Sequence, residues 1–145
     1  VYRFRELHII MAQYFAKIGP DDIVVDVQVV ADDSINTDEK GSAFLNKLYG
    51  TDDEWLHSRK DVVGIDSDNP RVWPAYIDGK YLREDNVFID VCWFPSWTLD
   101  KTTYEWTPPK PKPADRPDRE TYWNEDAQLW MFRKTEPDFS DDPVE

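Results

Sequence analysis

Near the start of the chain, hydrophobic residues alternate with polar ones, as they do in β-strands. The runs Tyr14–Ile18 and Ile23–Val30 are separated by a Gly-Pro-Asp-Asp cluster that is typical of turns. These runs therefore predict an antiparallel hairpin. One side of the second run is apolar and the other is mixed, so we expect the apolar side to lie in the core. That side consists of Ile23, Val25, Val27 and Val29.

The hydrophobic period changes to a helical one over residues 37–48. Acidic residues fill the first turn and Gly50 follows the last, as at many helix ends. We predict one helix here, packed on the sheet through Phe44 and Leu48. Gly41 lies inside this helix, where glycine costs about 1 kcal/mol relative to alanine, so the early turns are expected to be weak.

After this helix the pattern favours short strands and turns. Trp55–Ser58 and Val62–Ile65 are predicted strands, and Asp66–Pro70 is a predicted loop because the residue before a proline avoids the helical region. No further helix is expected.

Four segments place aromatic residues on both sides of a short acidic turn, which is the spacing of a small hairpin. They are residues 75–81, 81–88, 97–106 and 122–130. Aromatic pairs that face each other across such hairpins add roughly 0.2–1 kcal/mol each. Between the last two lies a proline-rich stretch, which cannot donate a full ladder of hydrogen bonds and should run as an extended strap.

These patterns predict an α+β, mostly β fold: an N-terminal antiparallel sheet with one packed helix, followed by aromatic β-hairpins joined by a proline-rich strap. We divide the chain into a leader or tag-like extension (1–10), a β-rich domain with one helix (11–106), the strap (107–120), a C-terminal tryptophan hairpin (121–133) and a loose acidic tail (134–145). A length of 145 residues leaves no room for a second large domain.

Composition narrows the class of protein. With 40% hydrophobic and 14% aromatic residues the chain is expected to fold. A net charge of -13 opposes binding to a nucleic-acid backbone, so we expect no nucleic-acid partner. No apolar run approaches the roughly 20 residues that cross a bilayer, so we expect no membrane partner either. The single cysteine, Cys92, cannot form an internal disulfide, which fits synthesis in a reducing cytoplasm. We expect it to be a small buried hydrophobe.

The sequence lacks the usual catalytic motifs. His57 beside Ser58 and Asp61 resembles a nucleophilic set, but adjacency in sequence is not triad geometry, and we favour a partly exposed structural histidine. Among the carboxylate clusters, Asp66 with Asp68 is the best candidate for Ca²⁺, although acidic residues at turns more often serve local hydrogen bonds and solubility. We therefore predict no enzyme, no cofactor and no metal site.

Tryptophan is abundant, with seven residues in the chain. Those of the C-terminal hairpins suit either a sugar-stacking platform or the core of the hairpins themselves, and we favour packing. The strap suits either contact with a neighbouring subunit or an ordinary linker. The candidate partner-binding residues are Trp97, Trp106, Pro108, Pro109, Pro111, Trp123 and Trp130.

Several segments resemble a family of small proteins encoded by marine cyanophages and related tailed phages. They are Phe94–Asp100 (Phe-Pro-Ser-Trp-Thr-Leu-Asp), Trp106, the Pro-Pro-Lys-Pro run, Tyr122–Asp126 and Trp130 and, further upstream, Met11-Ala12, Phe15–Ile18, Val27–Val30, Gly41 with Ala43-Phe44, and Gly50 before Trp55. The resemblance covers about residues 11–133. It implies a viral origin and a place on the particle, and it transfers no catalytic or ligand residues. The chain departs from the family at Leu45, where family members often have a cysteine. It also departs over residues 58–74, which lack the glycine- and tyrosine-rich sequence that is usual there.

We therefore expect a minor structural protein of a tailed phage particle that decorates or cements the capsid or tail. It would be made in the host cytoplasm, would reside in the virion, and would contact other phage structural proteins or further copies of itself. Two alternatives remain: a tail-fibre receptor- or glycan-binding module, and a tail-fibre assembly factor that is absent from mature virions.

Overall fold

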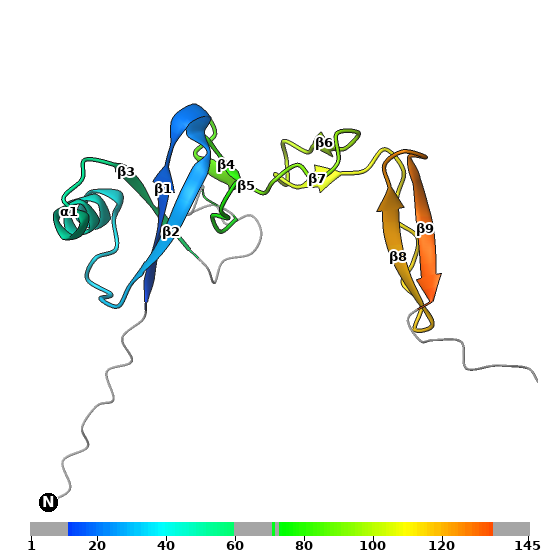
Figure 1. Ribbon diagram of the computed structural model, residues 1–145, viewed down its shortest axis with the longest axis horizontal. Helices are drawn as coiled ribbons and strands as arrows, with labels where there is room; N and C mark the ends of the chain where they lie inside the picture. Colours follow the sequence, from blue (N-terminus) through cyan, green and yellow to red (C-terminus); the bar gives the residue numbers. More distant parts are fainter. Residues whose placement is uncertain (1–11, 60–70, 72, 135–145) are drawn as a thin grey trace, which may run out of the picture. The chain divides into compact units, whose positions relative to one another are not determined.

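The computed structural model describes residues 12–59, 71 and 73–134 (Figure 1). Within these ranges the chain forms two compact units. The first contains residues 12–91 and 101–105, and the second contains residues 92–100 and 106–134. The predicted β-rich domain, residues 11–106, thus contributes to both units. The predicted N-terminal extension and acidic tail, apart from Lys134, and the strand and loop predicted over residues 62–70 lie outside the described residues.

The first unit is built on a three-stranded antiparallel sheet. Its strands are β1 (Gln13–Ile18), β2 (Val24–Val30) and β3 (Glu54–Ser58), in the order β2-β1-β3. The predicted hairpin of β1 and β2 is confirmed, and so is the strand before residue 59. A short 3-10 turn, η1 (Pro20–Asp22), connects β1 to β2.

The predicted buried side of β2 is only partly correct. The register shifts near the turn: Lys17 pairs with Asp26, but Ile18 pairs with Val24, so the residue between them is an extra one. This bulge moves Val24 onto the buried side, where Val27 packs as well. Val25 and Val29, predicted to lie in the core, are exposed, Val29 to 56%. For Val25, alternation fails because the inserted residue changes which side chains share a face.

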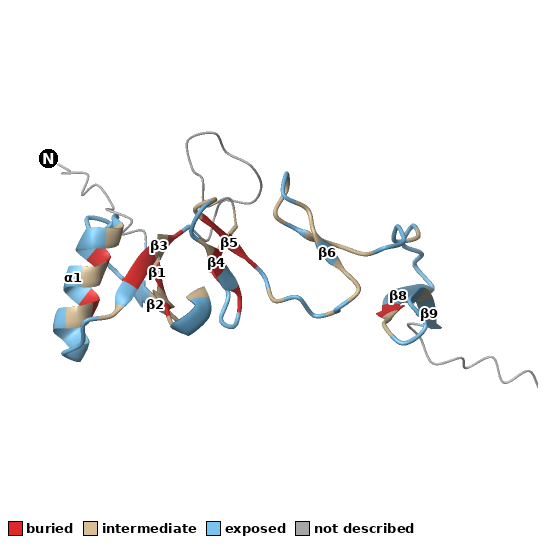
Figure 2. Ribbon diagram, turned by 90° about the horizontal axis from the view of Figure 1, so that it is seen from above, coloured by how far each residue is buried: buried red, intermediate tan, exposed pale blue. Residues whose placement is uncertain are grey.

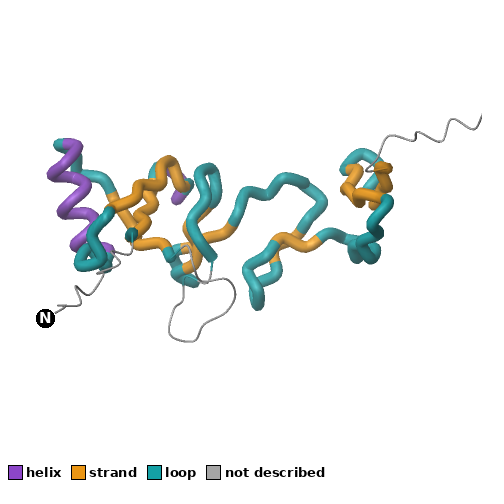
Figure 3. The backbone as a smooth tube through the Cα atoms, turned by 90° about the horizontal axis from the view of Figure 1, so that it is seen from below, coloured by secondary structure: helices purple, strands orange, loops and turns teal. Residues whose placement is uncertain are grey.

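The predicted helix is confirmed as α1 (Asp38–Tyr49). The Thr37 hydroxyl accepts a hydrogen bond from the Lys40 backbone N–H at 3.2 Å, which caps the first turn. Gly50 ends the helix in the left-handed conformation, at φ 66°. Among the described residues α1 is the only α-helix; the other, short purple segment in Figure 3 is the 3-10 turn η1.

The predicted packing face of α1 is wrong. Phe44 is exposed and Leu48 is 62% exposed, whereas Leu45 is buried with Phe15, Val30 and Trp55. The reason is Gly41, which faces the sheet and leaves room for the aromatic ring of Phe15. A Cβ atom at position 41 would lie 2.6 Å from Cζ of that ring and closer still to two other ring atoms.

The opposite face of the sheet is covered by a second hairpin, β4 (Lys80–Leu82) and β5 (Val87–Ile89). The predicted aromatic pair is confirmed: Tyr81 pairs with Phe88, and the ring centroids are 5.3 Å apart. Both residues pack against the sheet in a cluster with Ala16, Ile18, Val24, Leu56 and Ala75. The first unit thus has three layers, helix, sheet and hairpin, and buried residues are concentrated in the two β layers (Figure 2).

The second unit contains two two-stranded ribbons. The first pairs β6 (Thr98–Leu99) with β7 (Trp106–Thr107), and the other pairs β8 (Arg119–Asn124) with β9 (Leu129–Lys134). Together with the first unit they confirm the α+β, mostly β fold.

The four predicted aromatic hairpins have different outcomes. The pair Trp123 and Trp130 is confirmed, as in the β4–β5 hairpin. In the β6–β7 ribbon the residue opposite Trp106 is Leu99, which is not aromatic. The prediction of a facing aromatic pair in residues 97–106 is therefore wrong. Residues 75–81 form a turn rather than a hairpin, because no strand precedes β4 there and the Gly79 N–H bonds to the carbonyl of Tyr76 at 2.9 Å.

Candidate functional site

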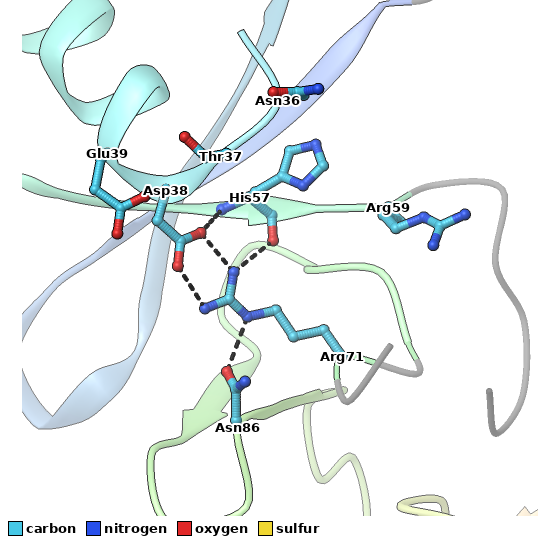
Figure 4. Close-up of a pocket in the computed structure, with 8 residues that line it drawn as sticks. All are labelled: Asn36, Thr37, Asp38, Glu39, His57, Arg59, Arg71 and Asn86. Carbon is cyan, nitrogen blue, oxygen red and sulfur yellow. Dashed lines mark hydrogen bonds and ion pairs between the residues drawn. The ribbon is translucent and has the colours of Figure 1, made fainter. Parts of the chain in front are cut away.

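In the first unit, a partly buried ion pair joins the start of α1 to distant parts of the chain (Figure 4). The guanidinium of Arg71 donates to both carboxylate oxygens of Asp38, at 2.6 and 2.8 Å. It also donates to the carbonyl of His57 at 2.9 Å and to the side-chain oxygen of Asn86 at 3.0 Å. We call these four residues the Arg71 clasp. It ties α1, β3 and the β4–β5 turn together.

The clasp shifts the protonation of its members. Partial burial by itself raises the pKa of Asp38, but hydrogen bonds from Arg71 and from the His57 backbone, with the Arg71 charge, outweigh it and hold that pKa below its ordinary value. Burial lowers the pKa of His57; the Asp38 carboxylate opposes this, and the nearby arginines add to it. Asp38 is therefore held charged and His57 is held neutral.

A pocket of about 310 Å³ opens beside the clasp. Its lining residues are Asn36, Thr37, Asp38, Glu39, His57, Arg59, Arg71 and Asn86. Two of the charged groups, Asp38 and Arg71, are paired with each other, and Nε2 of His57 lies 2.7 Å from the side-chain oxygen of Gln13. The pocket wall is thus held by interactions within the fold.

The nucleophilic set considered from the sequence does not assemble. His57 and Ser58 are neighbours in β3, so their side chains point to opposite faces of the sheet. The His57 ring lies 5.2 Å from the ring of Phe15, while the buried Ser58 hydroxyl accepts a hydrogen bond from the Ala75 N–H at 2.8 Å. Asp61 lies outside the described residues, as do Asp66 and Asp68.

In the second unit, three of the candidate residues come together. The ring of Trp97 lies 6.1 Å from that of Trp123 and 6.0 Å from that of Trp130, and the last two are 5.3 Å apart. We call these three residues the tryptophan cluster. Trp123 is buried and the other two are half-buried, so most of the indole surface is used in packing.

Glu125, which was not among the residues singled out from the sequence, stabilises this cluster by hydrogen bonds. Its carboxylate accepts hydrogen bonds from the indole N–H of Trp123 at 2.8 Å, and from the backbone N–H and hydroxyl of Ser96 at 2.9 and 2.7 Å. The hydrogen bond from Trp123 is the largest cause of the lowered pKa of Glu125, and the two hydrogen bonds from Ser96 lower this pKa further. Desolvation acts in the opposite direction and does not outweigh them. The acidic turn of the last hairpin was visible in the sequence, but its partner at position 96 was not.

The other candidate residues range from half-buried to exposed, and none of them makes a ring contact with the cluster among the described residues. Trp106 is half-buried on β7, Pro108 is half-buried, and Pro109 and Pro111 are exposed. The strap reaches the cluster through Lys110, whose carbonyl accepts a hydrogen bond from the indole N–H of Trp130 at 2.8 Å.

The ribbon of β8 and β9 also carries an outward apolar surface. Tyr122 pairs with Met131, and Leu129 lies next along the same face, so the three side chains are neighbours. Their exposed fractions are 36, 38 and 43% respectively. The guanidinium of Arg133 lies 4.8 Å from the centre of the Tyr122 ring. We call Tyr122, Leu129 and Met131 the ribbon surface.

The expectation for Cys92 is wrong. Its side chain is exposed, and the neighbouring Trp93 is 73% exposed. Residues 91–94 belong to no strand, and of their large side chains Phe94 packs on Trp97, with ring centroids 5.3 Å apart, whereas Trp93 faces solvent.

No cluster of three or more His, Cys, Asp or Glu side chains suited to a metal ion occurs in residues 12–59, 71 and 73–134. Over the same ranges no helix has the length and apolar character needed to cross a membrane. No family model, curated protein or solved structure matches this chain.

Proposed function

We propose that this protein is a minor structural component of a tailed phage particle, acting through protein–protein contacts made by its C-terminal unit. The observation that carries the proposal is the ribbon surface. A ribbon of only two strands is marginally stable in water, and this one presents three large apolar side chains to solvent. Such a surface suits contact with another protein.

The size of this contact favours a repeating assembly over a single complex. Full burial of a large apolar side chain stabilises by about 1.5–3 kcal/mol, and roughly 40% of each side chain on the ribbon surface remains to be buried. Complete coverage of all three would contribute about 2–4 kcal/mol, which is less than the usual cost of association. Contacts of this strength become effective when many copies are held on one lattice.

The resemblance of residues 11–133 to small cyanophage proteins supports the same proposal, and it is what points to a phage particle. On this reading the protein decorates or cements the capsid or tail, and its neighbours are other structural proteins of the virion. The glycan-binding alternative receives less support, because Trp97 and Trp123 pack against each other and not toward an open platform.

Mass spectrometry of purified particles tests the proposal. We expect the protein in particles that have been separated from cell lysate, at a constant ratio to the major structural proteins. Its absence from the particles, with abundance in the lysate, would instead identify an assembly factor and contradict the proposal.

A matched pair of variants tests the surface. Met131→Ser and Leu129→Ser remove exposed apolar groups from the ribbon surface, whereas Leu48→Ser removes an exposed apolar group from α1 in the other unit. We expect the double ribbon variant to fall at least about tenfold in particle content, a change of about 1.4 kcal/mol, while Leu48→Ser stays at the native level. Equal incorporation of both variants would rule out the ribbon surface as the contact.

A further inference from the structure

A hydrogen bond between the tryptophan cluster and the strap indicates a second kind of recognition in this protein. The indole N–H of Trp130 points to the backbone carbonyl of Lys110, in the middle of the proline-rich stretch. Thr107, Pro108 and Pro113 are half-buried, whereas Pro109 is exposed. The segment is thus half-buried at both ends and exposed between them, and its central carbonyl accepts the indole N–H of Trp130.

This arrangement follows the chemistry by which aromatic grooves recognise proline-rich peptides. Proline has no backbone N–H, so a proline-rich segment keeps carbonyl groups that no ladder uses, and it loses little conformational entropy when it binds. Tryptophan supplies both an apolar face and one donor for such a carbonyl. Two further indole rings, those of Trp97 and Trp123, lie 6.0 and 5.3 Å from the ring of Trp130.

We propose that the tryptophan cluster is a recognition site for a proline-rich peptide, that residues 107–113 occupy it within one copy, and that the same segment of a second copy occupies it when copies are held together. This inference concerns the isolated protein and does not rest on a place in a phage particle.

The charges of the second unit permit the approach of two copies. The whole chain has a net charge of -13. Residues 92–100 and 106–134 contain six basic and six acidic side chains, which cancel, whereas the tail, residues 135–145, carries five acidic side chains and no basic one. Two copies that meet through residues 92–100 and 106–134 therefore bring together segments without net charge.

The tether sets the expected affinity. A segment linked to its site by a short chain has an effective concentration of about 1 mM. If the site is about 90% occupied within one copy, the same segment supplied separately binds an open site with a Kd of about 0.1 mM. Exchange between free copies in dilute solution is then rare, and it becomes favoured when copies are concentrated.

The first test opens the site and supplies the segment as a peptide. Residues 108–113 are replaced by a Gly-Ser sequence of equal length in the full chain, and a peptide of residues 107–114 is titrated. The indole proton of Trp130, identified by its loss in Trp130→Phe, reports binding by NMR. We expect half-saturation near about 0.1 mM for the replaced chain and about tenfold higher for the native chain, where the tethered segment competes.

Two controls distinguish specific recognition of the proline-rich peptide from non-specific binding. A peptide with every proline changed to alanine should bind at least about threefold more weakly, and Trp93→Phe, an indole change at an exposed residue of the same unit, should leave the titration unchanged. No saturation by about 1 mM, or equal binding of the alanine peptide, would overturn the proposal.

The second test asks whether another copy supplies the segment. The replaced chain, labelled with a dye at its single exposed cysteine, Cys92, is mixed with unlabelled Trp130→Phe protein, which retains the segment but lacks the indole donor. We expect fluorescence anisotropy to rise with a midpoint near about 0.1 mM. An equal rise on mixing with unlabelled replaced chain, or none by about 1 mM, would show that copies do not exchange this segment.

Discussion

Replacing Gly41 with alanine should destabilise this protein, although the same change in an ordinary exposed helix stabilises by about 1 kcal/mol. The added Cβ would lie 2.6 Å from Cζ of Phe15 and closer to two further ring atoms, distances that force a shift. The Phe15 ring is completely buried among Val30, Leu45 and Trp55, so it has little space to move. Overpacking of this kind costs typically 1–3 kcal/mol.

The two effects set the expected size of the change. The very short separations place the overpacking cost near the upper end of its range, about 2–3 kcal/mol, so subtracting the gain in helix propensity leaves a net loss of about 1–2 kcal/mol in the free energy of unfolding. Urea denaturation followed by circular dichroism measures it. The matched background is Phe15→Leu, which removes the ring atoms that the Cβ would meet.

In that background Gly41→Ala should become neutral or stabilising, so the coupling between the two positions should be at least about 1 kcal/mol. If Gly41→Ala stabilises the native chain, or if its effect is the same in both backgrounds, the close approach of helix and ring is not what keeps glycine at this position.

Three further outcomes follow from the two units. Asp38→Asn removes the charge that binds Arg71 in the clasp, and it should lower the free energy of unfolding, measured by urea denaturation, by about 1.5–3 kcal/mol. The control Glu39→Gln, at the next position, should lower it by under roughly 0.5 kcal/mol, as is usual for surface sites. Stability should fall in two steps on acidification. The folded pKa of His57 lies below its unfolded value near 6.5, so stability declines as the pH falls below 6.5; the folded pKa of Asp38 lies below its unfolded value near 3.8, so a further loss follows below pH 3.8. Denaturation at several pH values checks both steps, and His57→Asn should remove the first. Trp123→Phe breaks the bond to Glu125 and should reduce the protection of the ribbon amides from hydrogen exchange more than Trp97→Phe, whose indole N–H has no hydrogen-bond partner among the described residues; equal effects would contradict this role of Glu125.

The parts of the fold that the sequence predicted are those decided by local chemistry. The β1–β2 turn, the ends of α1 and the pair Trp123 with Trp130 depend on residues within a few positions of one another. The face of β2 was predicted only in part, because a single bulged residue near Val25 overrides simple alternation. Likewise, the buried face of α1 depends on the fit between Gly41 and a ring from another strand, which periodicity does not contain.

The candidate sites show the same division. Trp123 and Trp130 were expected to face each other because a hairpin fixes their spacing, but the arrival of Trp97 depends on the path of a long connection. The Arg71 clasp gathers residues from positions 38, 57, 71 and 86, and no motif links them. Such polar junctions are specified by tertiary structure.

The strand order β2-β1-β3 has a consequence for synthesis of the protein. β1 is the middle strand of the sheet although it precedes its two neighbours in the chain. As the chain leaves the ribosome, β2 covers one edge of β1 at once, and the other edge stays open until α1 and β3 have been made. Lys17 is the one charged side chain of β1, and a charge on an open strand edge discourages pairing with a neighbouring chain.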